Sequence, residues 1–295
     1  MSRRSGRPKL RPPAEAVIES MTLEGKGIAH LDGKTVFIDG GIPGEKVVFA
    51  YVWRKAKYDE GRVIEVLEPS AERVEPKCPH YGVCGGCSWQ HIVPEAQIQY
   101  KQQAMLDSLQ RVGKVEPQEV FTPLTAEPWA YRRKARLGVR YVRKKARTLV
   151  GFRERDGRFL ADMQRCEILH PGVGEHLVAF QELINGLACR ETLPQIEVAV
   201  GDNAIALIFR HMEPLATADQ EALRDFGEQH NYQIYLQPKG PDTVHCIWPE
   251  QPELYYEHPQ FNSRINFGPQ DFFQVNQPLN QQMVARALEL LQPEA

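Results

Sequence analysis

A glycine-rich turn with three cysteines constrains this chain more than any other stretch. Cys78, Cys84 and Cys87 stand at C-x5-C-x2-C spacing, and two glycines between the last two let the backbone turn tightly. A C-x2-C pair in such a turn is typical of zinc and iron–sulfur sites, where thiolates converge on one centre. Because three thiolates do not complete a set of four sulfurs, we expect a fourth ligand from elsewhere, and Cys166 is the best candidate.

The spacing alone does not choose the metal. A structural zinc usually takes two pairs of closely spaced ligands, whereas this chain offers one pair, one outlying cysteine and one distant cysteine. That irregular set favours a [4Fe-4S] cluster. Its expected ligands are Cys78, Cys84, Cys87 and Cys166. The alternatives are no metal, or a zinc ion with a histidine ligand taken from His80, His91 and His170.

The compartment is predicted from the N-terminus and the apolar runs. The N-terminus has no apolar core of a signal peptide, and no apolar run reaches the roughly 18 residues of a membrane span. We therefore expect a cytoplasmic protein with no membrane partner and no disulfides. Cys189 and Cys246 have no partner at ligand spacing and are interpreted as small buried apolar residues.

Positive charge is segregated along a chain whose net charge is only −2. Residues 1–13 are predicted to be a disordered basic arm, and residues 131–158 hold a second dense block of arginines and lysines. Such segregation is typical of a surface that binds RNA or DNA. The alternative for either block is a solvated charged face.

Residues 14–70 are predicted to form a small barrel. Asp32-Gly33 between two apolar runs is a strong hairpin signal, and apolar residues alternate from Val47 to Trp53. Five short antiparallel strands in this stretch indicate a closed barrel of the OB type, a shape that often binds oligonucleotides.

Residues 71–275 are expected to form an α+β domain with an antiparallel sheet. A helix is predicted from Pro94 to about Val112, and Thr217 with Gln220 resembles a capping box that opens another. The buried face of the first helix is expected to consist of Ile98, Met105, Leu106 and Leu109. Residues 276–295 are expected to begin a further domain with a linking helix, from about Pro278 to Leu291, whose apolar face consists of Met283, Ala287, Leu288 and Leu291.

A basic strand stands near the middle of the chain. Its apolar residues alternate with lysine and arginine, so one side of the strand is expected to be buried and the other basic. The apolar side is Ala135, Leu137, Val139 and Tyr141. The expected phosphate contacts are Arg132, Arg133, Lys134, Arg136 and Arg140.

Together, the barrel, the cysteine turn, the basic strand, Cys166 and the segment Phe272-Phe273-Gln274-Val275-Asn276 resemble, in this order, the RNA uracil carbon-5 methyltransferase family. Within that family the sequence is most similar to the members that modify 23S rRNA. The resemblance implies a barrel of the TRAM type, a [4Fe-4S] cluster, a 23S rRNA substrate and a monomer. It also implies that Gln274 contacts S-adenosylmethionine and that Phe272 touches the extruded base.

One departure from the family shapes the expected fold class. In the family the last helix leads into a Rossmann-like domain with a glycine-rich cofactor loop and a cysteine nucleophile. Residues 172–174 are interpreted as a loop without that role, and neither Cys189 nor Cys246 lies in the nucleophile context. We therefore expect an α+β chain, stapled by an iron–sulfur cluster, that lacks its catalytic domain and is inactive alone. The alternatives are a non-catalytic RNA-binding module with a metal cluster and a zinc-stabilised DNA-binding protein.

Overall fold

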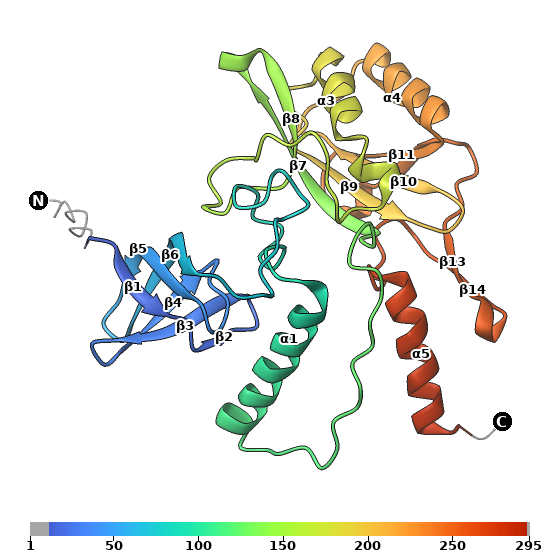
Figure 1. Ribbon diagram of the computed structural model, residues 1–295. Coiled ribbons are helices and arrows are strands. Elements are labelled where there is room, and N and C mark those ends of the chain that lie inside the picture. The colour runs from blue at the N-terminus through green and yellow to red at the C-terminus, as the bar shows by residue number, and fades with distance from the viewer. Residues whose placement is uncertain (1–11, 294–295) are drawn as a thin grey trace, which may run out of the picture. The chain divides into compact units, whose positions relative to one another are not determined.

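The computed structural model describes residues 12–293, which divide into two compact units (Figure 1). The first unit comprises Met1–Tyr81 and Cys87–Pro123, and the second comprises Gly82–Gly86 and Leu124–Ala295. The expected basic arm of residues 1–13 lies almost wholly outside the described residues.

The first unit begins with a closed barrel. Its strands are β1 (Ala14–Val17), β2 (Ser20–Met21), β3 (Lys26–Leu31), β4 (Lys34–Asp39), β5 (Lys46–Arg54) and β6 (Tyr58–Glu68). They pair in the order β1-β5-β6-β4-β3-β2. The edge strands β1 and β2 are successive pieces of one segment: Ile18 N donates to Glu45 O, and Glu19 N donates to Ile28 O. One segment therefore bonds to both ends of the sheet and closes it, and β4 and β6 pair in parallel.

Alternation along the strands builds the barrel core. Ile38, Val47 and Phe49 are fully buried, as expected for the inward residues of a barrel. Gly61 on β6 leaves room for the ring of Phe49, since a Cβ at that position would collide with it.

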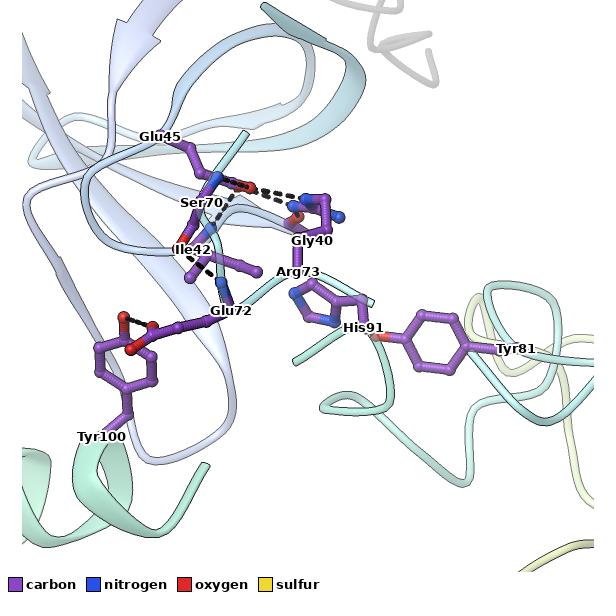
Figure 2. Close-up of polar contacts among 9 residues, drawn as sticks. All are labelled: Gly40, Ile42, Glu45, Ser70, Glu72, Arg73, Tyr81, His91 and Tyr100. Carbon is purple, nitrogen blue, oxygen red and sulfur yellow. Dashed lines mark hydrogen bonds and ion pairs between the residues drawn. The ribbon is translucent and has the colours of Figure 1, made fainter. Parts of the chain in front are cut away.

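A buried carboxylate joins the barrel to the chain that follows it (Figure 2). Glu45 is fully buried and accepts hydrogen bonds from Arg73 Nε (2.6 Å), Ile42 N (2.9 Å) and Ser70 N (3.2 Å). Arg73 also donates through Nη2 to Gly40 O at 2.7 Å. Burial opposes ionisation of Glu45, but these donors outweigh it and hold the pKa of Glu45 below its usual value.

The helix after the cysteine turn is α1 (Pro94–Ser108), which continues into a short π-helical turn, η1 (Leu109–Gly113). Its buried residues are Ala96 and Ala104, whereas Met105 and Leu109 are exposed. The apolar face predicted for this helix is therefore wrong. Ala96 packs with Met21, Ile42 and Ile92 in a small cluster beside the barrel.

The second unit is built on a sheet of six strands. These are β7 (Lys134–Val142), β8 (Arg147–Gly151), β9 (Gln195–Val200), β10 (Ile205–Arg210), β11 (Tyr232–Gln237) and β12 (His245–Trp248), in the order β12-β11-β10-β9-β7-β8. The same unit contains three helices before the hairpin: α2 (Pro171–Gly174), α3 (Leu177–Gly186) and α4 (Thr217–His230). A hairpin of β13 (Tyr255–His258) and β14 (Ser263–Asn266) follows, and then α5 (Gln277–Leu291). Short 3-10 turns are η2 (Arg143–Lys145), η3 (Pro241–Thr243) and η4 (Pro259–Phe261).

The expected antiparallel sheet is correct for four of its five pairings and wrong for one, because β10 and β11 pair in parallel. Helix α4 connects them and returns the chain to the end of the sheet where β10 began, so β11 runs in the same direction. Both strands are nearly continuous buried runs, which is typical of parallel strands covered on both faces. The expected capping box is also wrong: the residue before α4 is Ala216, and no side chain caps the helix.

The sheet is covered on two faces. Figure 1 shows α3 and α4 together on one side of it, where Phe180, Leu223 and Leu207 belong to the main hydrophobic cluster. A smaller cluster on the other face contains Ala206 and Phe273. The segment that leads into α5 is therefore anchored to the sheet through Phe273. Residues 172–174, expected as a loop, lie in the single turn α2.

Candidate functional site

The start of β7 holds the segment that contains Gln274. Arg133 N donates to Val275 O at 3.0 Å, and Arg132 forms an isolated bridge with Asn276. On its other side, Arg133 O accepts from Val200 N at 2.9 Å. The backbone of residues 275–276 therefore lies beside the basic strand as an additional short strand.

Lys134 fixes the turn that precedes this segment. Its Nζ donates to Asp271 O at 2.7 Å and to Pro269 O at 3.1 Å, and lies 5.7 Å from the centroid of the Phe273 ring. Within the turn, Gly268 N donates to Asp271 Oδ2 at 2.7 Å. Burial lowers the pKa of Lys134, while the neighbouring carboxylate of Glu197 opposes that shift. The ammonium group of this lysine is therefore hydrogen-bonded to the turn and stabilises it.

Arg133 is engaged in the same way. Its Nη1 lies 2.5 Å from Asp202 Oδ1, and Asp202 Oδ2 accepts from Gln277 Nε2 at 2.8 Å and Glu257 N at 2.8 Å. Asp202 stands in the turn between β9 and β10 and thereby connects β7, β13 and the first turn of α5. Nothing in the sequence singles out this residue, so its role was missed.

A shallow hollow opens above these contacts. Gln274 is exposed at its edge, and Phe272 beside it is 86% exposed. The hollow is lined by Arg133, Val200, Tyr256, Phe273, Gln274, Gln277 and Asn280. The amide groups around it can donate and accept hydrogen bonds to a small polar ligand. Of these lining residues, only Arg133 and Gln274 were singled out from the sequence.

The outward side of β7 is basic, as the alternation predicts. Ala135, Leu137 and Val139 are buried, while Arg136 and Arg140 face solvent. Arg136 is 73% exposed and its Nε lies 3.3 Å from Glu197 Oε2, so part of its charge is offset. The five predicted phosphate contacts thus separate into two groups. Arg132, Arg136 and Arg140 are exposed, whereas Arg133 and Lys134 are partly buried and bonded within the protein.

The expected iron–sulfur staple is not part of this structure. Among residues 12–293, no group of three or more His, Cys, Asp or Glu side chains could hold a metal ion. Cys78 and Cys87 belong to the first unit, and Cys84 and Cys166 to the second. In the second unit, Cys84 and Cys166 pack against the main hydrophobic cluster, and Gly86 N donates to Cys84 Sγ at 3.4 Å.

The remaining cysteines are half-buried thiols. Burial raises the pKa of Cys189 to about 12, with Asp219 adding to the shift, and burial also raises the pKa of Cys246. Both thiols are therefore protonated near neutral pH, as expected for packing residues. The structure shows no disulfide among the six cysteines, all of which lie in its described part. No helix in residues 12–293 is long and apolar enough to cross a membrane.

The fold is similar to that of a solved structure. The crystal structure of Pyrococcus abyssi tRNA (uracil-54, C5)-methyltransferase, in complex with S-adenosyl-L-homocysteine, aligns with 94% of this chain and 65% of its own chain. The TM-score is 0.65 at 18% sequence identity. This likeness corrects the expectation of an RNA-binding piece separate from a missing catalytic domain, because nearly all of the chain aligns within a methyltransferase.

Sequence comparison identifies the family. The chain is 52% identical over 291 residues to the 23S rRNA (uracil(1939)-C(5))-methyltransferase RlmD of Nitrosococcus oceani, which covers 97% of the chain and 65% of that protein. It is 47% identical over 283 residues to the protein of the same name from Acidithiobacillus ferrooxidans, covering 96% of the chain and 64% of that protein. The chain belongs to the family of 23S rRNA (uracil-C5)-methyltransferases. It spans about 65% of the length of these relatives. No family model matches it.

Proposed function

We propose that the protein carrying this chain methylates carbon 5 of a uridine in 23S rRNA with S-adenosylmethionine as the methyl donor. The names of the relatives support this activity. The observation that carries it for this chain is the position of Gln274, which is exposed at the edge of the hollow beside the exposed ring of Phe272. A methyl donor and a base held at these two residues would be neighbours.

In this proposal each group has a separate task. S-adenosylmethionine, when bound, supplies the methyl group. The amide of Gln274 hydrogen-bonds a polar part of that cofactor, and the flat face of Phe272 stacks on a base turned out of the RNA. Arg136 and Arg140 attract phosphates along the outer side of β7. Arg133 and Lys134 do not touch RNA but hold the Gln274 segment in position.

The barrel is proposed to hold flanking RNA. The turn between β5 and β6 exposes a continuous stretch, Trp53 to Lys57, that includes one indole and three cationic side chains. Lys55 Nζ donates to Tyr58 OH at 2.7 Å and lies 4.9 Å from the centroid of that ring. Aromatic rings beside cationic side chains are typical of surfaces that bind single-stranded RNA. The TRAM assignment of this barrel stays a prediction.

No step of the proposed function passes through a metal cluster. The role of Cys78, Cys84, Cys87 and Cys166 as ligands of a [4Fe-4S] cluster stays a prediction from their spacing. Iron and acid-labile sulfide analysis of the purified protein tests it, with Cys84→Ala losing the iron and Cys189→Ala keeping it. Equal iron content in the two variants would end that prediction. A monomeric state and a cytoplasmic location also stay predictions.

The experiment that tests the activity uses 23S rRNA labelled with tritium at carbon 5 of its uracils. Methylation at that carbon displaces the tritium into water, whereas methylation at any other atom leaves it in the RNA. The protein carrying this chain should release tritium only when S-adenosylmethionine is present. RNA binding without any release would instead favour the second candidate, a non-catalytic RNA-binding module, which the exposed arginines of β7 also support.

A further inference from the structure

A tight loop in the second unit, residues 153–160, presents one exposed aromatic ring. Phe159 is 66% exposed, although burying a phenylalanine normally favours folding by about 1.5–3 kcal/mol. A single exposed apolar side chain is ordinary on a protein surface. Here, however, the ring is carried by a hydrogen-bonded loop that also contains several charged side chains.

The loop is held by backbone hydrogen bonds on both sides. Glu154 N donates to Phe159 O at 2.9 Å, and Gly157 N donates to Glu154 O at 2.8 Å, with Gly157 at a φ of +72° that favours glycine. The cysteine turn supports the other side. Arg155 N donates to Val83 O at 3.0 Å, and Gly85 N donates to Arg153 O at 2.9 Å. The ring of Phe159 is therefore carried by a short loop whose backbone is hydrogen-bonded within itself and to the cysteine turn.

The loop that carries Phe159 also contains three arginines. Arg153, Arg155 and Arg158 are opposed by Glu154 and Asp156. Arg158 is 77% exposed and its Nε lies 3.6 Å from Asp156 Oδ2, while Arg153 Nη1 donates to Gly157 O at 3.1 Å. The excess charge is positive, so the loop is complementary to a phosphate backbone.

The size of the apolar surface favours a nucleobase over a protein partner. Among the large apolar side chains of the loop and the turn, only Phe159 and Val83 are strongly exposed, at 66% and 56%. A specific protein interface needs about 800 Å² on each partner, with a packed apolar centre. One ring beside arginines matches one unstacked base with its phosphate.

We propose that Phe159 is a stacking site for an unpaired base of the RNA, additional to Phe272, with Arg158 on the neighbouring phosphate. This proposal rests on the proposed function, because it takes RNA as the ligand. Preorganisation by the backbone bonds described above means that little ordering is required when the base binds. In this proposal the turn at residues 83–85 stabilises the RNA-binding loop through its two backbone hydrogen bonds.

The test measures binding of the full chain to two fluorescein-labelled RNAs by anisotropy. One is a hairpin with a single-stranded loop taken from 23S rRNA, and the other is a fully paired hairpin of the same length. Phe159→Ala should weaken binding of the looped RNA about 5- to 100-fold and leave the paired RNA nearly unchanged. Phe159→Trp should restore binding, whereas Phe159→Leu should not. The matched control is Phe261→Ala, another exposed phenylalanine at a turn, which should change neither affinity.

Salt dependence separates stacking from charge. Phe159→Ala should keep the slope of log affinity against log salt, and Arg158→Ala should reduce it by roughly 0.7. Equal affinity of wild type and Phe159→Ala for the looped RNA overturns the stacking site but leaves the proposed function intact. Wild-type affinity of Phe159→Leu for the looped RNA also overturns it, since a merely apolar contact would fit a protein partner. Wild-type protein that binds neither RNA overturns both proposals.

Discussion

Arg133 Nη1 and Asp202 Oδ1 lie 2.5 Å apart, and they join the basic strand to the turn between β9 and β10. The two side chains are only 19% and 24% exposed, so neither charge is fully solvated. Because the second oxygen of Asp202 also binds Gln277, this pair ties the start of α5 to the sheet. Arg133, predicted to contact an RNA phosphate, is bonded within the protein at the edge of the hollow.

Asp202→Asn should therefore destabilise the second unit by about 1–3 kcal/mol, because Arg133 would lose its ionic partner while remaining partly buried. The free energy of unfolding in urea measures this. Asp156→Asn, whose partner Arg158 is well exposed, is the matched control and should change it by less than about 0.5 kcal/mol. If the two variants unfold alike, the contact is not a structural tie.

The exposed arginines of β7 should contribute charge and little stability. Arg136→Ala with Arg140→Ala should lower affinity for rRNA and reduce the salt slope by roughly 0.7–0.9 for each phosphate that is no longer neutralised. Lys134→Ala should instead lower the urea midpoint, because the turn at residues 269–271 would lose its ammonium donor. An unchanged salt slope in the double variant would mean that this face does not bind RNA.

Glu45 should make the first unit sensitive to acid. Its pKa is below the usual value in the folded protein, so the unfolded chain binds a proton more readily than the folded chain. The stabilising contribution is therefore complete above the ordinary glutamate pKa of about 4.3 and is lost as pH falls through the lower folded value.

Glu45→Gln should remove this dependence and cost about 1–3 kcal/mol at neutral pH, since Arg73 would lose its charged acceptor. Unfolding followed between pH 7 and about pH 2.5 measures both effects. The control is Glu15→Gln, an exposed carboxylate paired with Lys46, which should leave the pH profile unchanged. A wild-type profile that is flat below about pH 5 would contradict the argument.

Gln274→Ala should weaken binding of S-adenosylhomocysteine by about 2- to 10-fold, because one hydrogen bond to the cofactor would be removed. Calorimetric titration of the protein carrying this chain gives the value. Gln103→Ala on α1 supplies a control that should bind as wild type does. Because Gln274 is exposed, its removal should leave the unfolding midpoint unchanged, which separates a binding role from a structural one.

Alternation along β7 could be predicted because a strand places successive side chains on opposite faces, and the structure has that pattern from Ala135 to Arg140. The direction of β11 could not, because the glutamines in the sequence of Tyr232–Gln237 hide its nearly continuous burial, and it is that burial which is typical of a parallel strand. The hydrogen bonds of Lys134 could not be predicted from the sequence either. Its acceptors are backbone oxygens of Pro269 and Asp271, which lie far along the chain and have no sequence signature.

The prediction of an apolar face on α1 was wrong for a different reason. Met105 and Leu109 have the right side chains for a core, but the helix buries its small residues, Ala96 and Ala104, where close approach matters more than size. Periodicity shows which residues share a side of a helix. It does not show which side meets the rest of the protein.

The closure of the barrel by β1 and β2 affects how the first unit meets other polypeptides. Since a single segment, Ala14 to Met21, bonds to both ends of the sheet, it covers β5 and part of β3 and leaves less strand edge onto which a neighbouring polypeptide could add a strand. We therefore expect the paired strands from Ala14 to Glu68 to resist edge-to-edge aggregation better than an open sheet would. Deleting Ala14–Val17 would expose β5 and should increase self-association of the protein.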